Sequence, residues 1–173
     1  MQYLTVRNVQ RGRLDLTHVE KFEVSADELE RLRLAQADIL IVEGNGSAAE
    51  IGRNALFSAR DEDWIHQNHV IRVRLRPDMA VPEFVSGFLN SATGRAQMLE
   101  KARTTSGLYS LSVRKVGELE VPLPSIPEQR ALAEALRVRA SIAASAREAA
   151  EGEVAAIRAL PASLLRRAFS EGL

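Results

Sequence analysis

Ser125-Ile126-Pro127-Glu128 opens the longest uninterrupted stretch of helix-forming residues in the chain. Ser125 is a favoured residue at a helix N-cap, and Glu128 follows three positions later, which is the spacing of a capping box. Pro127 falls within the first turn, where the N–H group that proline lacks would have no intrahelical partner. The sequence therefore predicts that a helix begins at Ile126.

The predicted helix extends to about residue 158, because it contains only one glycine, Gly152, and no proline follows its first turn before Leu160-Pro161. At 1.5 Å per residue it would be about 50 Å long, which is longer than a small domain is wide. We expect it to project from the rest of the chain, to end at Pro161 and to pack against a partner helix. The contact is expected along an alanine-rich apolar stripe: Ile126, Leu132, Leu136, Ile142, Ala146, Ala149 and Ile157.

Composition places the chain among ordinary water-soluble proteins. Its 173 residues are 46% hydrophobic and 27% charged, and the formal net charge is zero. A neutral chain is not expected to bind polyanions indiscriminately, although a local basic face remains compatible with it. The chain has no cysteine, which excludes disulfides and thiolate metal sites and makes the cytoplasm the expected compartment. Neither a membrane span nor a signal peptide is predicted.

The residues before the long helix predict a compact domain over residues 1–124. The predicted fold class is α+β, with a mixed or antiparallel-sheet domain followed by the long projecting C-terminal helix of residues 125–173. Ser25 and Glu28 repeat the capping-box spacing and predict a short helix to about Leu32. The remaining expected elements are strands over residues 3–9, 38–43, 51–57 and 70–76, and helices from Pro82 and over residues 93–102.

Three polar segments of this domain have the residue types of a recognition surface, namely 44–53, 66–69 and 104–110. Arginines would contact phosphates, while Arg53, Gln67 and Asn68 are candidates for reading base edges. For the amides, the competing interpretation is that they only hold a loop together. The full set of DNA-binding candidates is Gly44, Asn45, Gly46, Ser47, Arg53, His66, Gln67, Asn68, His69, Arg72, Arg74, Thr104, Thr105, Ser106 and Tyr109.

Catalytic and metal-binding interpretations of these segments are weaker. Gly44-Asn45-Gly46 invites a nucleotide-binding reading, but no helix pattern follows it and a loop with positive φ angles explains it as well. His66 and His69 are three residues apart at a strand start, where their side chains would point to opposite faces, so no metal site is expected. Asp61-Glu62-Asp63 resembles a magnesium-nuclease cluster, yet a solvated turn is the simpler interpretation.

Taken together, the segments resemble one half of the DNA specificity subunit of type I restriction–modification systems. Their order and spacing over nearly the whole chain carry the resemblance. The matching segments are Tyr3-Leu4-Thr5-Val6-Arg7-Asn8-Val9-Gln10, Gly12 to Leu16, Asp38-Ile39-Leu40-Ile41-Val42-Glu43-Gly44, Ile51-Gly52-Arg53, His66-Gln67-Asn68-His69-Val70-Ile71-Arg72-Val73, Thr104-Thr105-Ser106-Gly107-Leu108, Val121-Pro122-Leu123-Pro124, Pro127-Glu128-Gln129-Arg130 and Leu164-Leu165-Arg166-Arg167-Ala168-Phe169-Ser170.

The resemblance implies a non-catalytic subunit that reads double-stranded DNA. Residues 1–124 would be one target recognition domain, and residues 125–173 one spacer helix with a C-terminal cap, which dimerises and docks methylation subunits. The chain itself would hold no cofactor, since S-adenosylmethionine would be bound by the partner methylation subunit. Motor-nuclease subunits are further implied partners. Two copies are expected to form a homodimer through antiparallel pairing of residues 126–158, because a twofold partner would bury the apolar stripe.

Two features depart from the family pattern and leave an alternative open. Set against the family pattern, the sequence is expected to hold one recognition domain and to lack the segment that usually precedes the first strand, since Tyr3 stands close to its start. The alternative is an interaction or adaptor protein that keeps the fold and docks partner helices without reading DNA. The zero net charge and the missing segment both favour that alternative slightly.

Overall fold

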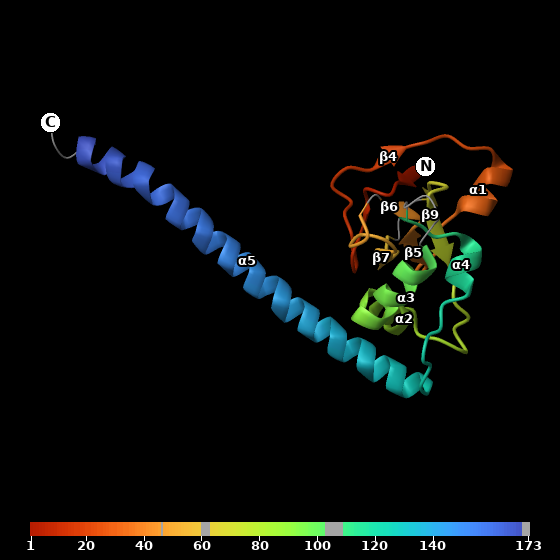
Figure 1. Cartoon of the computed structure of the whole chain (residues 1–173). Coiled ribbons are helices and arrows are strands. Elements are labelled where there is room, and N and C mark those ends of the chain that lie inside the picture. The colour runs from red at the N-terminus through yellow and green to blue at the C-terminus, as the bar shows by residue number, and fades with distance from the viewer. Residues whose placement is uncertain (46, 60–62, 103–108, 171–173) are drawn as a thin grey trace. The chain divides into compact units, whose positions relative to one another are not determined.

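The computed structural model of the chain describes residues 1–45, 47–59, 63–102 and 109–170. The chain forms two compact units, Met1–Ala133 and Glu134–Leu173. Within the described residues, short strands, four short helices and the first turns of the long C-terminal helix build the first unit, and the rest of that helix lies in the second (Figure 1). The α+β class expected from the sequence is confirmed.

Ten strands and five helices lie within the described residues. The strands are β1 (Gln2–Leu4), β2 (Val9–Gln10), β3 (Arg13–Leu14), β4 (Glu20–Lys21), β5 (Ile39–Val42), β6 (Gly44–Asn45), β7 (Asn54–Leu56), β8 (Trp64–His66), β9 (Val70–Val73) and β10 (Tyr109–Ser110). The helices are α1 (Ala26–Leu32), α2 (Pro82–Asn90), α3 (Ala92–Ala102), α4 (Val113–Gly117) and α5 (Ile126–Ser170).

The strands form small sheets of both mixed and antiparallel type. In the central sheet, β5 lies between β7 and β9 and is antiparallel to both, so that Leu40 stands opposite Ala55 on one side and Arg72 on the other. In a second sheet, β1 pairs antiparallel with β4 and parallel with β8. Two-stranded pairs join β2 to β3 and β6 to β10. The expected mixed or antiparallel sheet is thereby confirmed.

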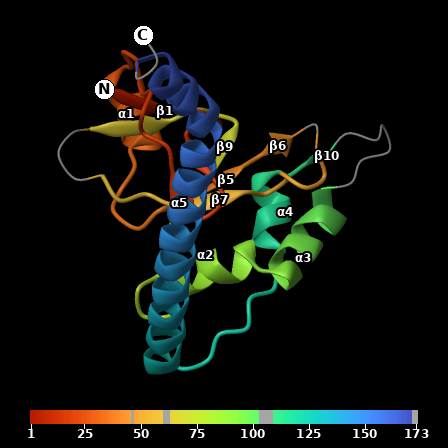
Figure 2. The same ribbon diagram turned by 90° about the vertical axis from the view of Figure 1, so that its left-hand side faces the viewer.

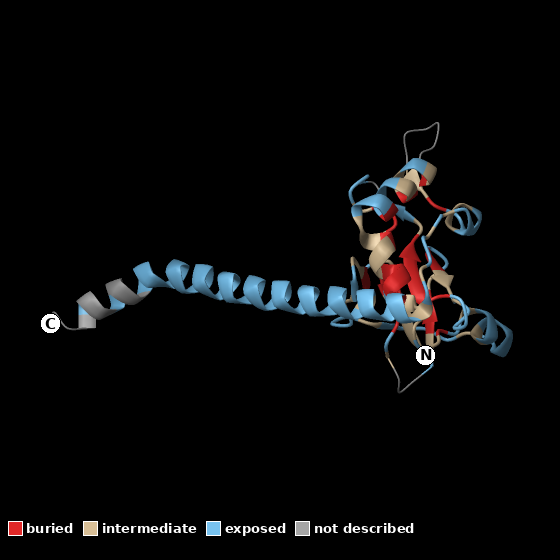
Figure 3. Cartoon of the chain, turned by 90° about the horizontal axis from the view of Figure 1, so that it is seen from below, coloured by how far each residue is buried: buried red, intermediate tan, exposed pale blue. Residues whose placement is uncertain are grey.

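Strand β5 is the centre of the hydrophobic core. Ile39 and Ile41 pack into a cluster that includes residues of α2 and α3, whereas Leu40 and Val42 pack into a second cluster with residues of β1 and β2. All four side chains are at most 1% exposed, and buried residues gather at this position in Figure 3. A strand buried on both faces needs an uninterrupted apolar sequence, which is why residues 38–43 could be identified in advance.

The predicted helices of the first unit are present: α1 ends at Leu32, α2 begins at Pro82 and α3 ends at Ala102, as expected. The capping box of α1 is complete, since Ser25 accepts from the Glu28 N–H and the Glu28 carboxylate accepts from the Ser25 N–H. Helices α2 and α3 pack closely at Gly94, where an added Cβ would collide with the backbone of Phe88 and Leu89. This contact brings α3, which carries Arg95, against the end of α2.

The strand expected over residues 3–9 is interrupted. The Asn8 Oδ1 accepts from the Thr5 N–H at 2.9 Å and from the Thr5 hydroxyl at 3.0 Å, which closes residues 5–8 into a turn between β1 and β2. Short polar side chains of this kind bind nearby backbone groups and so compete with sheet pairing. The resulting turn borders the candidate site described below.

The long helix begins as expected but does not end at Pro161. At its start the Glu128 carboxylate accepts from the Ser125 N–H at 3.0 Å and from the Ser125 hydroxyl. It then continues through Pro161 to Ser170, so the predicted break at Leu160-Pro161 is wrong. Proline removes one backbone hydrogen bond and crowds the preceding turn, and the turns on either side maintain the helix.

Gln129 ties the first turns of α5 to the first unit. Its side chain is buried, with Oε1 accepting from the Val81 N–H at 2.8 Å and Nε2 donating to the carbonyls of Pro124 at 2.8 Å and Met79 at 3.4 Å. Ala133, one turn later, also packs against the core. The buried amide therefore bonds three backbone groups and joins α5 to the segments before α2 and before α5 itself.

Replacing Gln129 by leucine is expected to lower the free energy of unfolding by about 2–3 kcal/mol, because each buried polar group left unpaired costs roughly 1–3 kcal/mol. Urea denaturation followed by circular dichroism measures the loss. Arg130→Leu is the matched control, since Arg130 is exposed and its replacement should change stability by less than about 0.5 kcal/mol. Equal midpoints for the two variants would contradict this role of Gln129.

Candidate nucleic-acid interface

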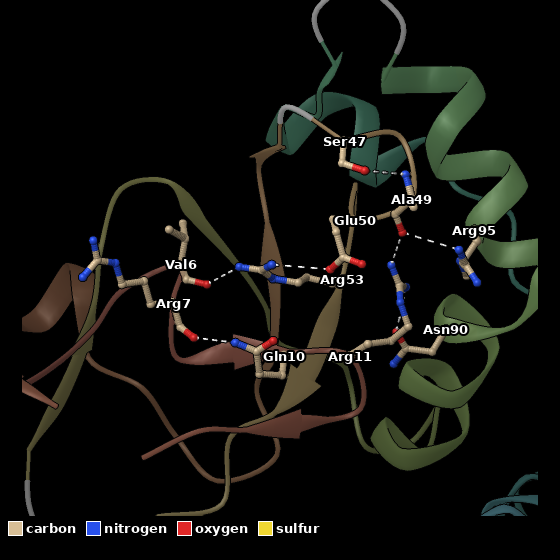
Figure 4. Close-up of polar contacts among 10 residues, drawn as sticks. All are labelled: Val6, Arg7, Gln10, Arg11, Ser47, Ala49, Glu50, Arg53, Asn90 and Arg95. Atoms are coloured by element: carbon tan, nitrogen blue, oxygen red, sulfur yellow. Dashed lines mark hydrogen bonds and ion pairs between the residues drawn. The ribbon is translucent and has the colours of Figure 1, made fainter. Parts of the chain in front are cut away.

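The turn of residues 5–8 is held in place by side chains from two other parts of the chain. The Arg53 guanidinium donates through Nη2 to the Val6 carbonyl at 2.7 Å (Figure 4). The Gln67 Oε1 accepts from the Val6 N–H at 3.4 Å. Asn8, which is buried, donates to the carbonyls of Asp15 and His18. The turn is thus a fixed element that leaves the side chain of Arg7 exposed.

Parts of the three segments predicted to contact DNA meet at the end of β5. Strand β6 pairs with β10, which places Gly44 opposite Ser110 (Figure 2). The Glu43 N–H donates to the His69 carbonyl at 3.0 Å, and the Glu43 carbonyl accepts from the Leu111 N–H. Backbone hydrogen bonds therefore join segments that are far apart in the sequence into one surface.

A hollow of about 370 Å³ lies at this junction. On its wall, the His69 Nδ1 is 3.0 Å from a carboxylate oxygen of Glu43. These side chains offer both hydrogen-bond donors and acceptors, and a carboxylate can accept from the amino group of cytosine while amides pair with adenine. The lining residues are Val6, Glu43, Gly44, Gln67, His69 and Ser110.

An arginine cluster lies beside this junction, around the loop that precedes β7. Arg11 and Arg95 both donate to the Ala49 carbonyl, at 3.0 and 3.4 Å (Figure 4). Glu50 is 3.5 Å from Arg53, and the charges of Arg95, Glu50 and Arg53 all act on Arg11. Burial lowers the pKa of Arg11, and the positive charge of Arg95 lowers it further. The local surplus of positive charge suits a phosphate group.

Asn90 and Asn54 connect Arg11 of this cluster to the protein interior through hydrogen bonds. Arg11 donates to the Asn90 Oδ1 at 3.3 Å, and the Asn90 amide in turn donates to the carbonyl and side-chain oxygens of Asn54 at 3.1 Å. Asn54 is fully buried and accepts from the Ser86 hydroxyl at 2.9 Å. A satisfied buried network of this kind fixes side-chain positions, so Arg11 is held in one orientation.

Only some of the predicted site residues are exposed near the junction. Ser47, Asn68 and His69 are exposed near the junction, and Tyr109 is half-buried beside Gly44 in the β6–β10 pair. Gln67 holds the 5–8 turn, as the alternative interpretation of the amides anticipated. Gly46 and residues 104–106 lie outside the described residues, and of Asn45 only the backbone is described.

Three predicted arginines have internal partners. The side chain of Arg53 is 15% exposed and bridges Val6 and Glu50. Arg74 binds the buried carboxylate of Asp38 through two hydrogen bonds of 2.7 and 2.8 Å, and Arg72 donates to the Arg33 carbonyl. Because β9 runs antiparallel to β5, Arg72 and Arg74 stand toward the opposite end of the central sheet from Glu43. The structure therefore does not bring these two arginines to the junction.

His66 is buried at the end of β8, where its Nδ1 lies 3.0 Å from the Gln67 carbonyl. Burial lowers the pKa of His66, and the hydrogen bond to Gln67 opposes this shift. The unfolded chain therefore takes up a proton at higher pH than the folded chain. The stability that neutral His66 contributes is present above the unfolded pKa near 6.5 and is lost as pH falls below it.

We expect the free energy of unfolding to decrease between pH 7.5 and pH 5.5, and the decrease to be smaller in His66→Gln. Denaturant titrations at several pH values measure this slope. A slope that is identical in His66→Gln and wild type would contradict the assignment.

Four residues of the interface were missed by sequence reasoning: Arg7, Arg11, Glu43 and Arg95. Arg11 and Arg95 are brought together only by the fold, and neither belongs to a recognisable motif. Within the described residues, no group of three or more histidine and acidic side chains could hold a metal ion. In that same part of the chain, no helix combines the length and apolar character needed to cross a membrane.

The exposed stripe of α5 is a second surface of interest. Ile142 and Ile157 are each 64% exposed, and Leu132 and Leu136 are each 48% exposed. Ala146 and Ala149 are also exposed, whereas Ile126 is half-buried at the helix start. Apolar side chains arranged in this way along a helix mark a candidate protein-binding surface.

Sequence comparisons find similarity to curated type I restriction specificity subunits. The chain is 28% identical over 167 residues to the type I restriction enzyme EcoKI specificity subunit of Escherichia coli K12, covering 96% of this chain and 36% of that protein. By sequence, the chain is related to type I restriction specificity subunits. A second such subunit, StySPI from Salmonella potsdam, is 23% identical over 149 residues, covering 86% of this chain and 32% of that protein.

The chain therefore spans about a third of the length of the type I specificity subunits that it matches. No family model matches the sequence. The similarity runs through both the first unit and the long helix, since it covers nearly the whole chain in the first comparison. It is consistent with the resemblance that the order of the sequence segments indicated.

Proposed function

We propose that this chain is a non-catalytic DNA-recognition subunit of a type I restriction–modification complex. The observation that carries the proposal is the convergence of Arg11 and Arg95 on the Ala49 carbonyl beside the junction of the predicted contact segments, with Arg7 exposed on the 5–8 turn. Arginines of this kind position a protein on phosphates, while the adjacent hollow offers groups suited to base edges. The names of the two relatives, both specificity subunits, support this role.

Each part of the interface has a proposed task. Arg7, Arg11 and Arg95 contact the phosphate backbone and set the register. Asn68 and His69, which are exposed beside the hollow, contact base edges together with Glu43. Arg53 and Gln67 act indirectly, because both are bonded to the 5–8 turn and keep it in position.

The long helix has a proposed role in assembly. Two copies pair through the apolar stripe of α5 in antiparallel fashion, and the dimer carries two recognition units. Its target is a split DNA site with two symmetric halves. The same assembly positions methylation subunits, which supply S-adenosylmethionine, and motor-nuclease subunits complete the complex. The resemblance supports the methylation and motor-nuclease subunits as partners, and the exposed stripe supports the pairing of two copies.

Selection from a library of randomised duplex DNA tests the recognition role. The purified full-length chain is incubated with the library at low and at physiological salt, and bound DNA is sequenced. The proposal predicts enrichment of one motif and an affinity that falls with increasing salt. Recovery of unenriched DNA only, or of none, would overturn DNA reading and leave the adaptor alternative, in which the fold docks partner helices alone.

A further inference from the structure

A seam of nine residues runs along α5 on one side of the helix. Successive members are three or four positions apart, which keeps them on one face at 3.6 residues per turn. The intervals are 3, 4, 3, 4, 4, 3, 4 and 3, so the pattern reads the same from either end. The members are Leu132, Ala135, Arg139, Ile142, Ala146, Ala150, Glu153, Ile157 and Leu160.

This seam is uncovered within the described chain. All nine side chains are exposed, including Ile142, Ile157 and Leu160 at 52–64%. Gln129 and Ala133, which pack on the first unit, lie about 100–140° around the helix from the centre of the seam and adjoin it only at Leu132. The seam is therefore a separate face of α5.

Arg139 and Glu153 are the two charged members of the seam, and they lie seven positions on either side of Ala146. Two ion pairs run along the helix, Arg137 with Glu134 and Arg147 with Glu151, and neither includes a member of the seam. Arg139 and Glu153 have no such partner within the described residues. A charge enclosed in an apolar contact is costly unless an opposite charge meets it.

We propose that the seam pairs with the seam of a second copy of this chain, antiparallel and centred on Ala146. This inference rests on the dimer that was proposed above as part of the function. It adds the register in which the two helices align. In this register Arg139 of each copy meets Glu153 of the other. The dimer therefore contains two opposite-charge pairs, and all four charges are neutralised. The remaining pairs are Leu132 with Leu160, Ala135 with Ile157, Ile142 with Ala150, and Ala146 with Ala146.

Other alignments of two copies leave these charges unpaired. A shift by one heptad places Arg139 against Leu160 and Glu153 against Ala146. A parallel pair in register places Arg139 against Arg139 and Glu153 against Glu153, and like charges in contact cost several kcal/mol. The register centred on Ala146 also sets each isoleucine against an alanine, so that large and small side chains interdigitate.

Charge reversal tests the register in the full-length chain. In a homodimer of Arg139→Glu, two acidic pairs replace the two opposite-charge pairs, and Glu153→Arg creates two basic pairs. Each variant alone should have a dimer dissociation constant at least about tenfold higher than wild type. An equimolar mixture of the two variants restores both opposite-charge pairs and should form a heterodimer with nearly wild-type affinity. Analytical ultracentrifugation measures all four samples.

Glu148→Arg is the matched control, because it changes the charge by the same amount on the far side of the helix. Circular dichroism checks that each variant keeps its helix content. Unchanged dimerisation of both single variants, or no heterodimer in the mixture, would overturn the register while leaving the dimer itself in place. A wild-type chain that stays monomeric at micromolar concentration would overturn the register together with the dimer, whereas the DNA-selection experiment tests DNA reading separately.

Discussion

Replacing both Ile142 and Ile157 by aspartate is expected to convert the dimer into a monomer. Each isoleucine is 64% exposed in the single chain and would be covered by the partner helix. Burial of one such side chain contributes about 1.5–3 kcal/mol, and four are lost per dimer. The dissociation constant should therefore rise by at least about 1,000-fold. Light scattering at micromolar concentration should report the mass of one chain.

Ala144→Asp provides the comparison for this substitution. Ala144 is exposed on the side of α5 that faces away from the seam, so one added carboxylate there should leave the dimer intact. Circular dichroism verifies that the helix persists in both proteins. A dimer that survives the double isoleucine substitution would show that the stripe is not the assembly surface.

The second large effect is expected at the arginine cluster. Replacing Arg11 and Arg95 by alanine removes two proposed phosphate contacts, so DNA affinity near 0.1 M salt should fall by about 100-fold. The slope of log affinity against log salt should become shallower by about two, and the loss should be similar for all DNA sequences. Fluorescence anisotropy titrations at several salt concentrations measure both quantities.

Arg76→Ala is the control for this pair, because Arg76 is exposed and its partner is Asp78, two residues along the chain. It should leave both the affinity and the salt slope unchanged. Denaturant unfolding of the double variant separates a loss of binding from a loss of folding, since Arg11 also bonds Asn90. A well-folded double variant with wild-type affinity would show that Arg11 and Arg95 do not contact DNA.

The elements that the sequence predicted well are those set by local rules. Strand β5 is an uninterrupted apolar run because both of its faces are buried. Helix α1 is bounded by a complete capping box. The interruption at residues 5–8 depends on the side-chain bonds between Thr5 and Asn8, which residue patterns do not reveal. Continuity through Pro161 likewise depends on the turns around it.

The candidate site was predictable only in part, because it is assembled from distant segments. The glycine-containing loop after β5 and the segment after β8 were identified from their polar residues, and backbone pairing brings them together. Arg11 and Arg95 converge on Ala49 through the packing of α3 on α2, for which the sequence has no local signal. Arg53 was expected to contact bases, yet its side chain is mostly covered.

The central claim is that two copies of this chain read a split DNA site and position methylation subunits on it. Co-expression with a cognate methylation subunit, followed by single-molecule sequencing of host DNA for methylated adenine, tests it most directly. The account predicts a new methylated motif with two symmetric half-sites separated by a fixed gap. An intact complex of the two proteins that produces no new methylated motif would contradict it.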